Sequence, residues 1–180
     1  MTDRPARRRI LFVCTANICR SPSAELLARR RFGEDGMMFR SAGFLEPDRA
    51  CPSELVTVLA DRGIDARNHR SYRLDDASLA AADLLLTMES SHVQKATMID
   101  PEAFRKIVPL KEAALVVARG GGSTLTIEEF LEELNHERDP LQYLGTGWDV
   151  DDPYGGRVKA YQRAVGEIDE LVTTTLSLLR

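Results

Sequence analysis

Residues 10–33 read ILFVCTANICRSPSAELLARRRFG, and this stretch decides the fold. It opens on a short continuous apolar run, Ile10–Val13, which is typical of a strand buried on both faces of a parallel sheet. A polar segment, Cys14–Ser21, follows. Pro22 then suits the first turn of a helix, where its missing N–H would have no partner anyway, and Gly33 can end that helix. The stretch therefore predicts a strand, a loop and a helix in that order.

The rest of the chain repeats this alternation. Apolar runs predict further strands at Met37–Ala42, Asp83–Met88 and Lys106–Leu110, with Pro109 confining the last one to an edge or a terminus. Helical patterns occupy residues 52–61, 89–96, 111–118, 126–134 and 158–179. Because strands alternate with helices, we expect an α/β fold, a three-layer sandwich in which a four-stranded parallel sheet is flanked by helices.

Length and composition restrict the protein class. The chain has 180 residues, so we expect one domain over 1–180, with a flexible basic tip at 1–8. The net charge of −4 gives no reason to expect nucleic-acid binding. No apolar run approaches the ~20 residues that span a bilayer, so we expect no membrane association. Three cysteines, Cys14, Cys19 and Cys51, are too few for a disulfide framework and indicate a reducing, cytoplasmic location.

The Cys14–Ser21 loop contains the residue types of a phosphate site with a nucleophile. Backbone N–H groups of a loop that enters a helix N-terminus form a cradle for an anion. The same helix end favours a thiolate at Cys14. The Arg20 guanidinium can bind two oxygens of a tetrahedral anion, and Ser21 can donate its hydroxyl to the sulfur. These residues predict attack of Cys14 on phosphorus through a phosphocysteine intermediate.

The leaving alcohol or phenol needs a proton, so the chain must also supply a general acid. Proline follows an aspartate at Asp100, Asp139 and Asp152, and it keeps each aspartate extended, which suits presentation from a loop. We expect Asp152 to be the acid, because Tyr154 follows it just before the last helix. Tyr154 can also line a pocket for an aromatic leaving group.

With these residues in place, the chain resembles the low-molecular-weight protein tyrosine phosphatases. Their signature V-C-x-G-N-x-C-R-S-P is matched by VCTANICRSPSAE at 13–25, and their late D-P-Y by DDPYGG at 151–156. Weaker matches lie between them, in family order, at Arg40–Gly43, Gly63-Ile64 and Asp83–Met88. The resemblance implies a four-stranded parallel sheet with a phosphate-binding loop after the first strand. It implies no metal and no other cofactor.

The resemblance also implies roles for the matched residues. Cys14 would be the nucleophile, and Asp152 would donate the proton and later activate water. The phosphate cradle would consist of Thr15, Ala16, Asn17, Ile18, Cys19, Arg20 and Ser21. Asn17 would hold the loop in shape, with Ser41 as a supporting hydrogen-bond partner. Ser21 would stabilise the thiolate.

Cys19 would be the thiol that traps oxidised Cys14 as a reversible disulfide, although packing explains a buried cysteine equally well. We interpret Cys51 as structural. His69, His92 and His136 are scattered without metal-ligand spacing, and we expect solvated or core positions for them.

Three departures from the family pattern concern the substrate. Ala16 replaces a glycine, and a positive φ there would cost about 1 kcal/mol. Only Phe44–Glu46 precedes Pro47, where members that bind phosphotyrosine often have a longer loop with an aromatic wall. An insert over 119–150 precedes Asp152, and it contains a predicted helix and Trp148, a residue suited either to a pocket wall or to the core.

We therefore expect a metal-independent phosphatase that acts on phosphate monoesters, above all protein phosphotyrosine. Its partners would be phosphorylated proteins or small phosphate esters. Two alternatives remain open. A thiol-linked arsenate reductase would need further cysteines near Cys14, and only Cys19 and Cys51 are available. A phosphate- or phosphopeptide-binding module without turnover is the alternative that Ala16 motivates.

Overall fold

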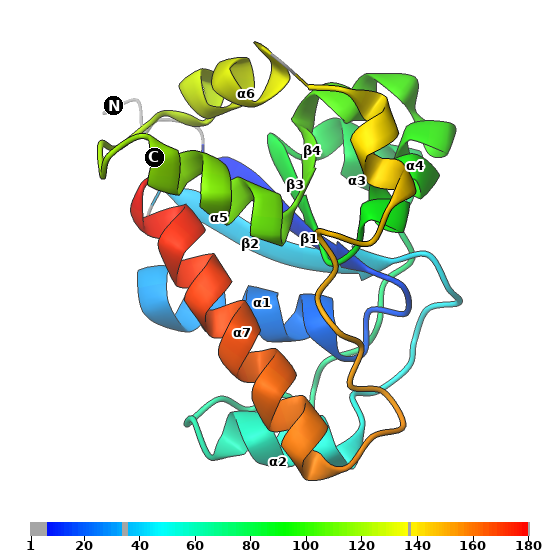
Figure 1. Cartoon of the computed structure of the whole chain (residues 1–180). Helices are drawn as coiled ribbons and strands as arrows, with labels where there is room; N and C mark the ends of the chain where they lie inside the picture. The colour runs from blue at the N-terminus through cyan, green and yellow to red at the C-terminus, as the bar shows by residue number, and fades with distance from the viewer. Residues whose placement is uncertain (1–6, 34–35, 137, 180) are drawn as a thin grey trace, which may run out of the picture.

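The computed structural model describes residues 7–33, 36–136 and 138–179, and Figure 1 shows its arrangement. Within these residues the strands are β1 (Arg8–Cys14), β2 (Met37–Gly43), β3 (Leu84–Thr87) and β4 (Ile107–Pro109). The α-helices are α1 (Arg20–Phe32), α2 (Ser53–Ala60), α3 (Asp76–Ala81), α4 (Ser90–Ile99), α5 (Leu110–Arg119), α6 (Ile127–His136) and α7 (Val158–Ser177). Two 3₁₀ helices, η1 (Pro101–Lys106) and η2 (Pro140–Leu144), complete the described elements.

The four strands form one parallel sheet in the order β2-β1-β3-β4. This confirms the predicted α/β fold. Pro109 lies in β4 at the sheet edge, where a missing N–H is tolerated. The chain moves from β1 outward to β2 and returns on the other side to β3. The carboxyl ends of β1 and β3 therefore flank a switch point, which is where ligands bind in open α/β sheets.

Helices cover both faces of the sheet and make the expected three layers (Figure 1). On one face, Ile10, Phe12 and Leu86 pack with apolar residues of α1, α2, α5, α6 and α7. On the other face, Leu11 and Val13 pack with residues of α3, α4, η1 and η2. Adjacent residues of β1 thus belong to opposite cores, as the two-residue period of a strand requires. Burial on both faces explains the continuous apolar run in the sequence.

Most predicted boundaries agree with the structure, but several features differ. The flexible tip expected over 1–8 is wrong at Arg8, which belongs to β1 and pairs with Met37; residues 1–6 lie outside the described residues. Helix α3 was not expected, because it is short. It is initiated by a local capping box in which Asp75 accepts from the Ser78 N–H.

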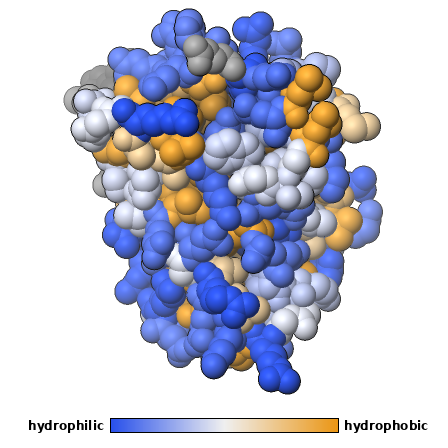
Figure 2. All heavy atoms as spheres, viewed as in Figure 1, coloured by the Kyte–Doolittle hydropathy of each residue, from blue (hydrophilic) through white to orange (hydrophobic). Residues whose placement is uncertain are grey.

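The segment 119–150 contains α6, which the capping pattern predicts, and η2, which it does not. Figure 2 shows a mainly hydrophilic face, with hydrophobic residues gathered over η2 at the upper right. Leu141 and Leu144 of η2 are exposed. In the parts of the chain that the structure describes, no helix is long and apolar enough to cross a bilayer.

Candidate active site

Cys14 is the last residue of β1, and the chain turns at once into a loop that ends where α1 begins at Arg20. The Cys14 side chain is buried. Its Sγ accepts a hydrogen bond from the Asn17 N–H at 3.3 Å and lies 3.0 Å from the Ser21 Oγ. The N-terminus of α1 lies at the same place and favours negative charge. An amide, a hydroxyl and a helix end thus converge on the Cys14 sulfur.

Asn17 holds the loop through a directional relay. Its Oδ1 accepts from the Tyr72 N–H at 2.8 Å, so its Nδ2 must point the other way and donates to Ser21 Oγ at 2.8 Å. The Ser21 hydroxyl proton is then left for the Cys14 sulfur or for the Ala42 carbonyl, which is 3.3 Å away. Asn17 is fully buried and has a φ of 53°, a conformation that asparagine tolerates better than most residues.

The expected contact between Ser41 and Asn17 is not formed. Ser41 donates instead to Glu25 Oε2 of α1 at 2.5 Å. Ser41 lies two residues before Gly43 in β2, so its side chain faces α1 one pleat below the loop. The partner of Asn17 comes from the backbone at Tyr72, and a backbone partner leaves no signature in the sequence.

Ala16 does not adopt a positive φ; the described non-glycine residues that do are Asn17 and Asp48. The penalty considered for alanine therefore does not arise. The glycine that the loop needs lies in β2. A Cβ on Gly43 would lie 2.7 Å from the Asn17 nitrogen and 2.9 Å from both the Ala16 carbonyl carbon and the Thr15 oxygen. Gly43 thus allows the loop to pass over the end of the sheet.

Arg20 is buried to 2% exposure and connects distant segments. Its Nη1 donates to Glu89 Oε1 at 2.6 Å and to the Val150 carbonyl at 3.0 Å. Its Nη2 donates to Asp152 Oδ2 at 2.8 Å and reaches Thr15 Oγ1 at 3.4 Å. The guanidinium plane is therefore fixed, and its outer nitrogen faces the predicted acid.

Asp152 is the one predicted acid that reaches the loop. Asp100 and Asp139 accept from the N–H groups of Glu102 and Leu141, and so they cap η1 and η2. Asp152 accepts from Arg20 through Oδ2 and from the Tyr154 N–H through Oδ1, at 3.2 Å. The sequence does not decide which of the three Asp-Pro pairs lies at the site, and the structure places only the Asp152 pair there.

Two contacts just upstream fix the segment that carries Asp152. The Val150 N–H pairs with the Met88 carbonyl at 2.8 Å, just beyond β3. Asp149 Oδ1 accepts from the Ser90 N–H at 2.8 Å, at the N-terminus of α4. These contacts hold the segment at the carboxyl end of the sheet, beside the loop.

A pocket of about 140 Å³ joins these residues. Its lining residues are Cys14, Thr15, Ala16, Ile18, Cys19, Arg20, Leu45, Arg49, Asp152 and Tyr154. Tyr154 lines the pocket as expected. The short loop after β2 places aliphatic Leu45 in the wall, while Phe44 stacks on His92 with ring centroids 5.4 Å apart. Trp148 packs against the core on the α4 side of the sheet.

Three residues to which the sequence analysis assigns no role at the site, His69, His92 and Glu89, support the loop. His69 Nε2 lies 2.7 Å from the Asn17 carbonyl oxygen. His92 Nε2 lies 3.0 Å from Thr15 Oγ1, and burial lowers the pKa of His92 to about 4, so the ring is neutral at neutral pH. Glu89 binds Arg20. No motif marks these residues, because their contacts join segments far apart in the chain.

The three cysteines are free thiols. Burial raises the pKa of Cys19 to about 12, and burial raises the pKa of Cys51 to about 12 as well. Both are therefore protonated at neutral pH, and a protonated thiol is a weak nucleophile. The trapping of oxidised Cys14 by Cys19 stays a prediction. Within the described residues, no group of three or more histidine, cysteine or acidic side chains is arranged to hold a metal ion.

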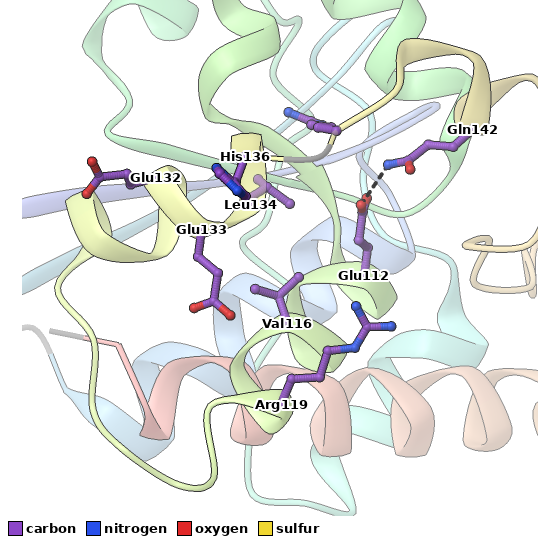
Figure 3. Close-up of a pocket in the computed structure, with 9 residues that line it drawn as sticks. Glu112, Val116, Arg119, Glu132, Glu133, Leu134, His136 and Gln142 are labelled. Atoms are coloured by element: carbon purple, nitrogen blue, oxygen red, sulfur yellow. Dashed lines mark hydrogen bonds between the residues drawn. The ribbon is translucent and has the colours of Figure 1, made fainter.

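A larger groove of about 610 Å³ lies between α5 and α6 (Figure 3). Glu132 and Glu133 come from α6, and Glu112 of α5 accepts from Gln142 at 2.8 Å. Burial raises the pKa of Glu112, which also accepts from the Tyr143 hydroxyl. This groove shares no lining residue with the Cys14 pocket and contains no nucleophile beside an anion cradle. The smaller pocket is therefore the candidate active site.

Comparison with known proteins identifies related sequences and structures. The model of the low molecular weight phosphotyrosine protein phosphatase family matches residues 9–120. A protein-arginine-phosphatase of Geobacillus stearothermophilus is 31% identical over 166 residues, covering 91% of this chain and 90% of that protein. The low molecular weight protein-tyrosine-phosphatase Etp of Escherichia coli (strain K12) is 38% identical over 97 residues, covering 52% of this chain and 62% of that protein. A crystal structure of a low molecular weight protein tyrosine phosphatase from T. tengcongensis has a TM-score of 0.71 and 31% identity, covering 94% of this chain and 98% of that chain.

Proposed function

Since the chain belongs to the low molecular weight phosphotyrosine protein phosphatase family and is a cysteine-based phosphatase, we propose that its substrate is phosphotyrosine in proteins. The observation that carries the proposal is that Arg20 meets both Asp152 and the loop of Cys14 in one pocket. The reaction then follows from the positions of these side chains.

In the first step, the Cys14 thiolate attacks phosphorus and the bond from phosphorus to the phenolic oxygen breaks. Loop N–H groups and Arg20 hold the equatorial oxygens while charge moves onto them. Asp152, in its protonated form, gives its proton to the departing phenolate, so tyrosine leaves as a neutral phenol. Phosphate and the Asp152 carboxylate compete for the Arg20 Nη2, and binding of phosphate therefore frees Asp152 for this proton.

In the second step, the Asp152 carboxylate takes a proton from water, and the water oxygen attacks the phosphocysteine. Inorganic phosphate leaves, and the Cys14 thiolate returns. Ser21 supports both steps, because its hydroxyl can donate to the sulfur whenever the sulfur carries negative charge.

The pocket walls favour a neutral aromatic group over a phosphorylated guanidinium. Ile18, Leu45 and Tyr154 offer apolar surface to a ring, and stacking against Tyr154 suits a phenol. Arg49 adds a positive charge to the same wall, and this charge repels a guanidinium. Phosphoarginine is the second candidate, because two relatives that match over nearly the whole chain are protein-arginine-phosphatases.

The experiment compares one peptide sequence phosphorylated on tyrosine, on arginine or on serine. We expect kcat/KM for phosphotyrosine to exceed the other two by at least about tenfold. Faster hydrolysis of the phosphoarginine peptide would show that phosphoarginine, and not phosphotyrosine, is the preferred substrate. Binding of phosphopeptide without any turnover would favour the binding-module alternative.

The arsenate reductase alternative lacks support in the geometry. Such a relay needs a second thiol that attacks readily, and burial keeps Cys19 and Cys51 protonated at neutral pH. We further propose that the protein acts in the cytoplasm, since free thiols are typical of reducing compartments. Consumption of a thiol reductant that depends on arsenate would revive the alternative.

A further inference from the structure

Arg49 is a half-buried cation in the wall of the active-site pocket, and the proposed chemistry does not use it. Other arginines in the same region have acidic partners: Arg67 pairs with Asp65 at 2.8 Å, and Arg73 with Glu46 at 3.1 Å. Within the described residues, the Arg49 guanidinium forms no ion pair.

The backbone of Arg49 is held firmly in place. Its N–H donates to Ser71 Oγ at 3.0 Å, and its carbonyl accepts from the Ser71 N–H at 2.8 Å. The preceding residue, Asp48, donates its own N–H to the Ser71 carbonyl at 2.9 Å and has a φ of 66°. A positive φ is uncommon for a non-glycine residue, although aspartate tolerates it better than most, and such residues cluster at functional sites.

The support of Arg49 is also the support of the catalytic loop. Ser71 adjoins Tyr72, whose N–H donates to Asn17, and His69 lies against the Asn17 carbonyl oxygen. A short path of hydrogen bonds thus connects Arg49 to the loop that holds the phosphate. The backbone of Arg49 is therefore held at a defined place relative to Cys14.

The acidic residues near the pocket mouth are paired with Arg20 and not with Arg49. Asp152 and Glu89 are the acids beside the loop, and both bind Arg20. The neighbours of Arg49 in the wall, Leu45 and Tyr154, have no negative charge to offer. A guanidinium is best satisfied by a carboxylate, which it binds through two parallel hydrogen bonds. A carboxylate on the substrate would supply such a partner.

We propose that Arg49 binds the carboxylate of an aspartate or glutamate adjacent to the phosphotyrosine, so that acidic phosphopeptides are the preferred substrates. This inference rests on the proposed function and names its substrate class. The phosphate enters at Cys14, the ring lies between Ile18 and Tyr154, and the peptide backbone crosses the mouth beside Arg49.

The test measures KM and kcat for a pair of phosphotyrosine peptides that differ only in acidic or alanine neighbours, together with phenyl phosphate. The wild-type protein should show a KM about fivefold lower for the acidic peptide, with kcat nearly equal. Arg49→Gln should abolish this difference by raising the KM of the acidic peptide more than that of phenyl phosphate, and Arg49→Lys should retain part of the difference. The preference should weaken as salt is raised.

Arg70→Gln is the matched control. Arg70 is exposed, donates to the Arg67 and His69 carbonyls, and does not line the pocket. This variant removes one positive charge from the same region and should keep the preference. If Arg70→Gln and Arg49→Gln reduce the preference equally, the region acts through general charge and the assigned contact is wrong. An equal rise of KM for phenyl phosphate in Arg49→Gln would mean that Arg49 binds phosphate itself, which also overturns the proposal.

Failure of the proposed function has a different signature, since the wild-type protein would then hydrolyse neither peptide. Calorimetry with the same two peptides would measure the preference as an affinity ratio in that case. Equal affinities for the acidic and the alanine peptide would contradict the role of Arg49.

Discussion

Arg20 Nη2 and Asp152 Oδ2 lie 2.8 Å apart, although 132 positions separate the two residues in the chain. Arg20 follows β1, and Asp152 lies just before α7, so the pair closes the pocket from two sides. The Arg20 side chain is 2% exposed, whereas that of Asp152 is 45% exposed. The arginine is thus fixed, whereas the carboxyl is accessible to solvent, which suits the proton transfers proposed for it.

Asp152→Asn should slow turnover in proportion to the difficulty of the leaving group. The amide keeps the size of the side chain but has no acidic proton to give. For phenyl phosphate we expect kcat/KM, which reports on the step that releases the phenol, to fall about 10²- to 10⁴-fold, with a smaller loss for a 4-nitrophenyl ester, whose phenolate leaves without help. Asp139→Asn is the control, because Asp139 caps η2 and does not line the pocket. Equal losses of kcat/KM for both esters would contradict proton donation by Asp152 to the leaving group.

Cys14→Ser should abolish hydrolysis of every phosphate ester while the fold is retained. Oxygen can replace sulfur in the hydrogen bonds from Asn17 and Ser21, but a serine hydroxyl is not ionised at neutral pH. Steady-state assays and thermal unfolding measure the two properties separately. Residual turnover at the wild-type rate would contradict a thiolate nucleophile.

Gly43→Ala should damage both stability and activity, although Gly43 contacts no substrate. The added methyl group would lie 2.7 Å from the Asn17 nitrogen, so the loop must move. We expect a loss of about 1–3 kcal/mol in unfolding free energy, together with a fall in kcat. Gly145→Ala is the matched control, because a Cβ at Gly145 meets no atom within 4 Å and its φ is −99°. Urea unfolding and phosphatase assays of both variants check this prediction.

His92 should make stability sensitive to mild acid. Burial lowers the pKa of His92 from 6.5 to about 4, so the unfolded chain binds the proton more readily than the folded chain does. The stabilising contribution is complete above pH 6.5 and is lost as the pH falls towards 4. At pH 4.5 the free energy of unfolding should have fallen by about 2–3 kcal/mol on this account. His92→Gln lacks this titration. Urea unfolding at pH 7.5 and 4.5 should therefore show a smaller acid-induced loss in the variant than in the wild type.

The sequence predicts the sheet well because each strand leaves a local trace. Ile10–Val13 and Leu84–Leu86 are apolar without interruption, since helices cover both faces of the sheet. The loop from Cys14 to Arg20 is also a local feature, and both its residue types and its place after the first strand are predicted. Helix α3 is not predicted, because it is too short to display a helical period.

The residues that hold the site in place cannot be predicted from local sequence patterns, because their contacts join segments far apart in the chain. His69, His92 and Glu89 contact Asn17, Thr15 and Arg20 across gaps of 52, 77 and 69 positions. The partner of Asn17 is a backbone N–H, which every residue except proline provides. Ser41 donates a hydrogen bond to Glu25. The residues around Ser41 in the sequence do not distinguish it from a serine whose side chain would face the loop.

The Val150–Met88 and Asp149–Ser90 contacts have an architectural consequence. Both lie downstream of α6 and η2, so the chain is anchored again to the sheet just before it presents Asp152. Buried residues such as Phe130 and Tyr143 pack α6 and η2 against the core, so these two elements do not vary freely. The exposed turn at 121–124, by contrast, can change in length or accept an engineered tag while the reacting groups keep their positions.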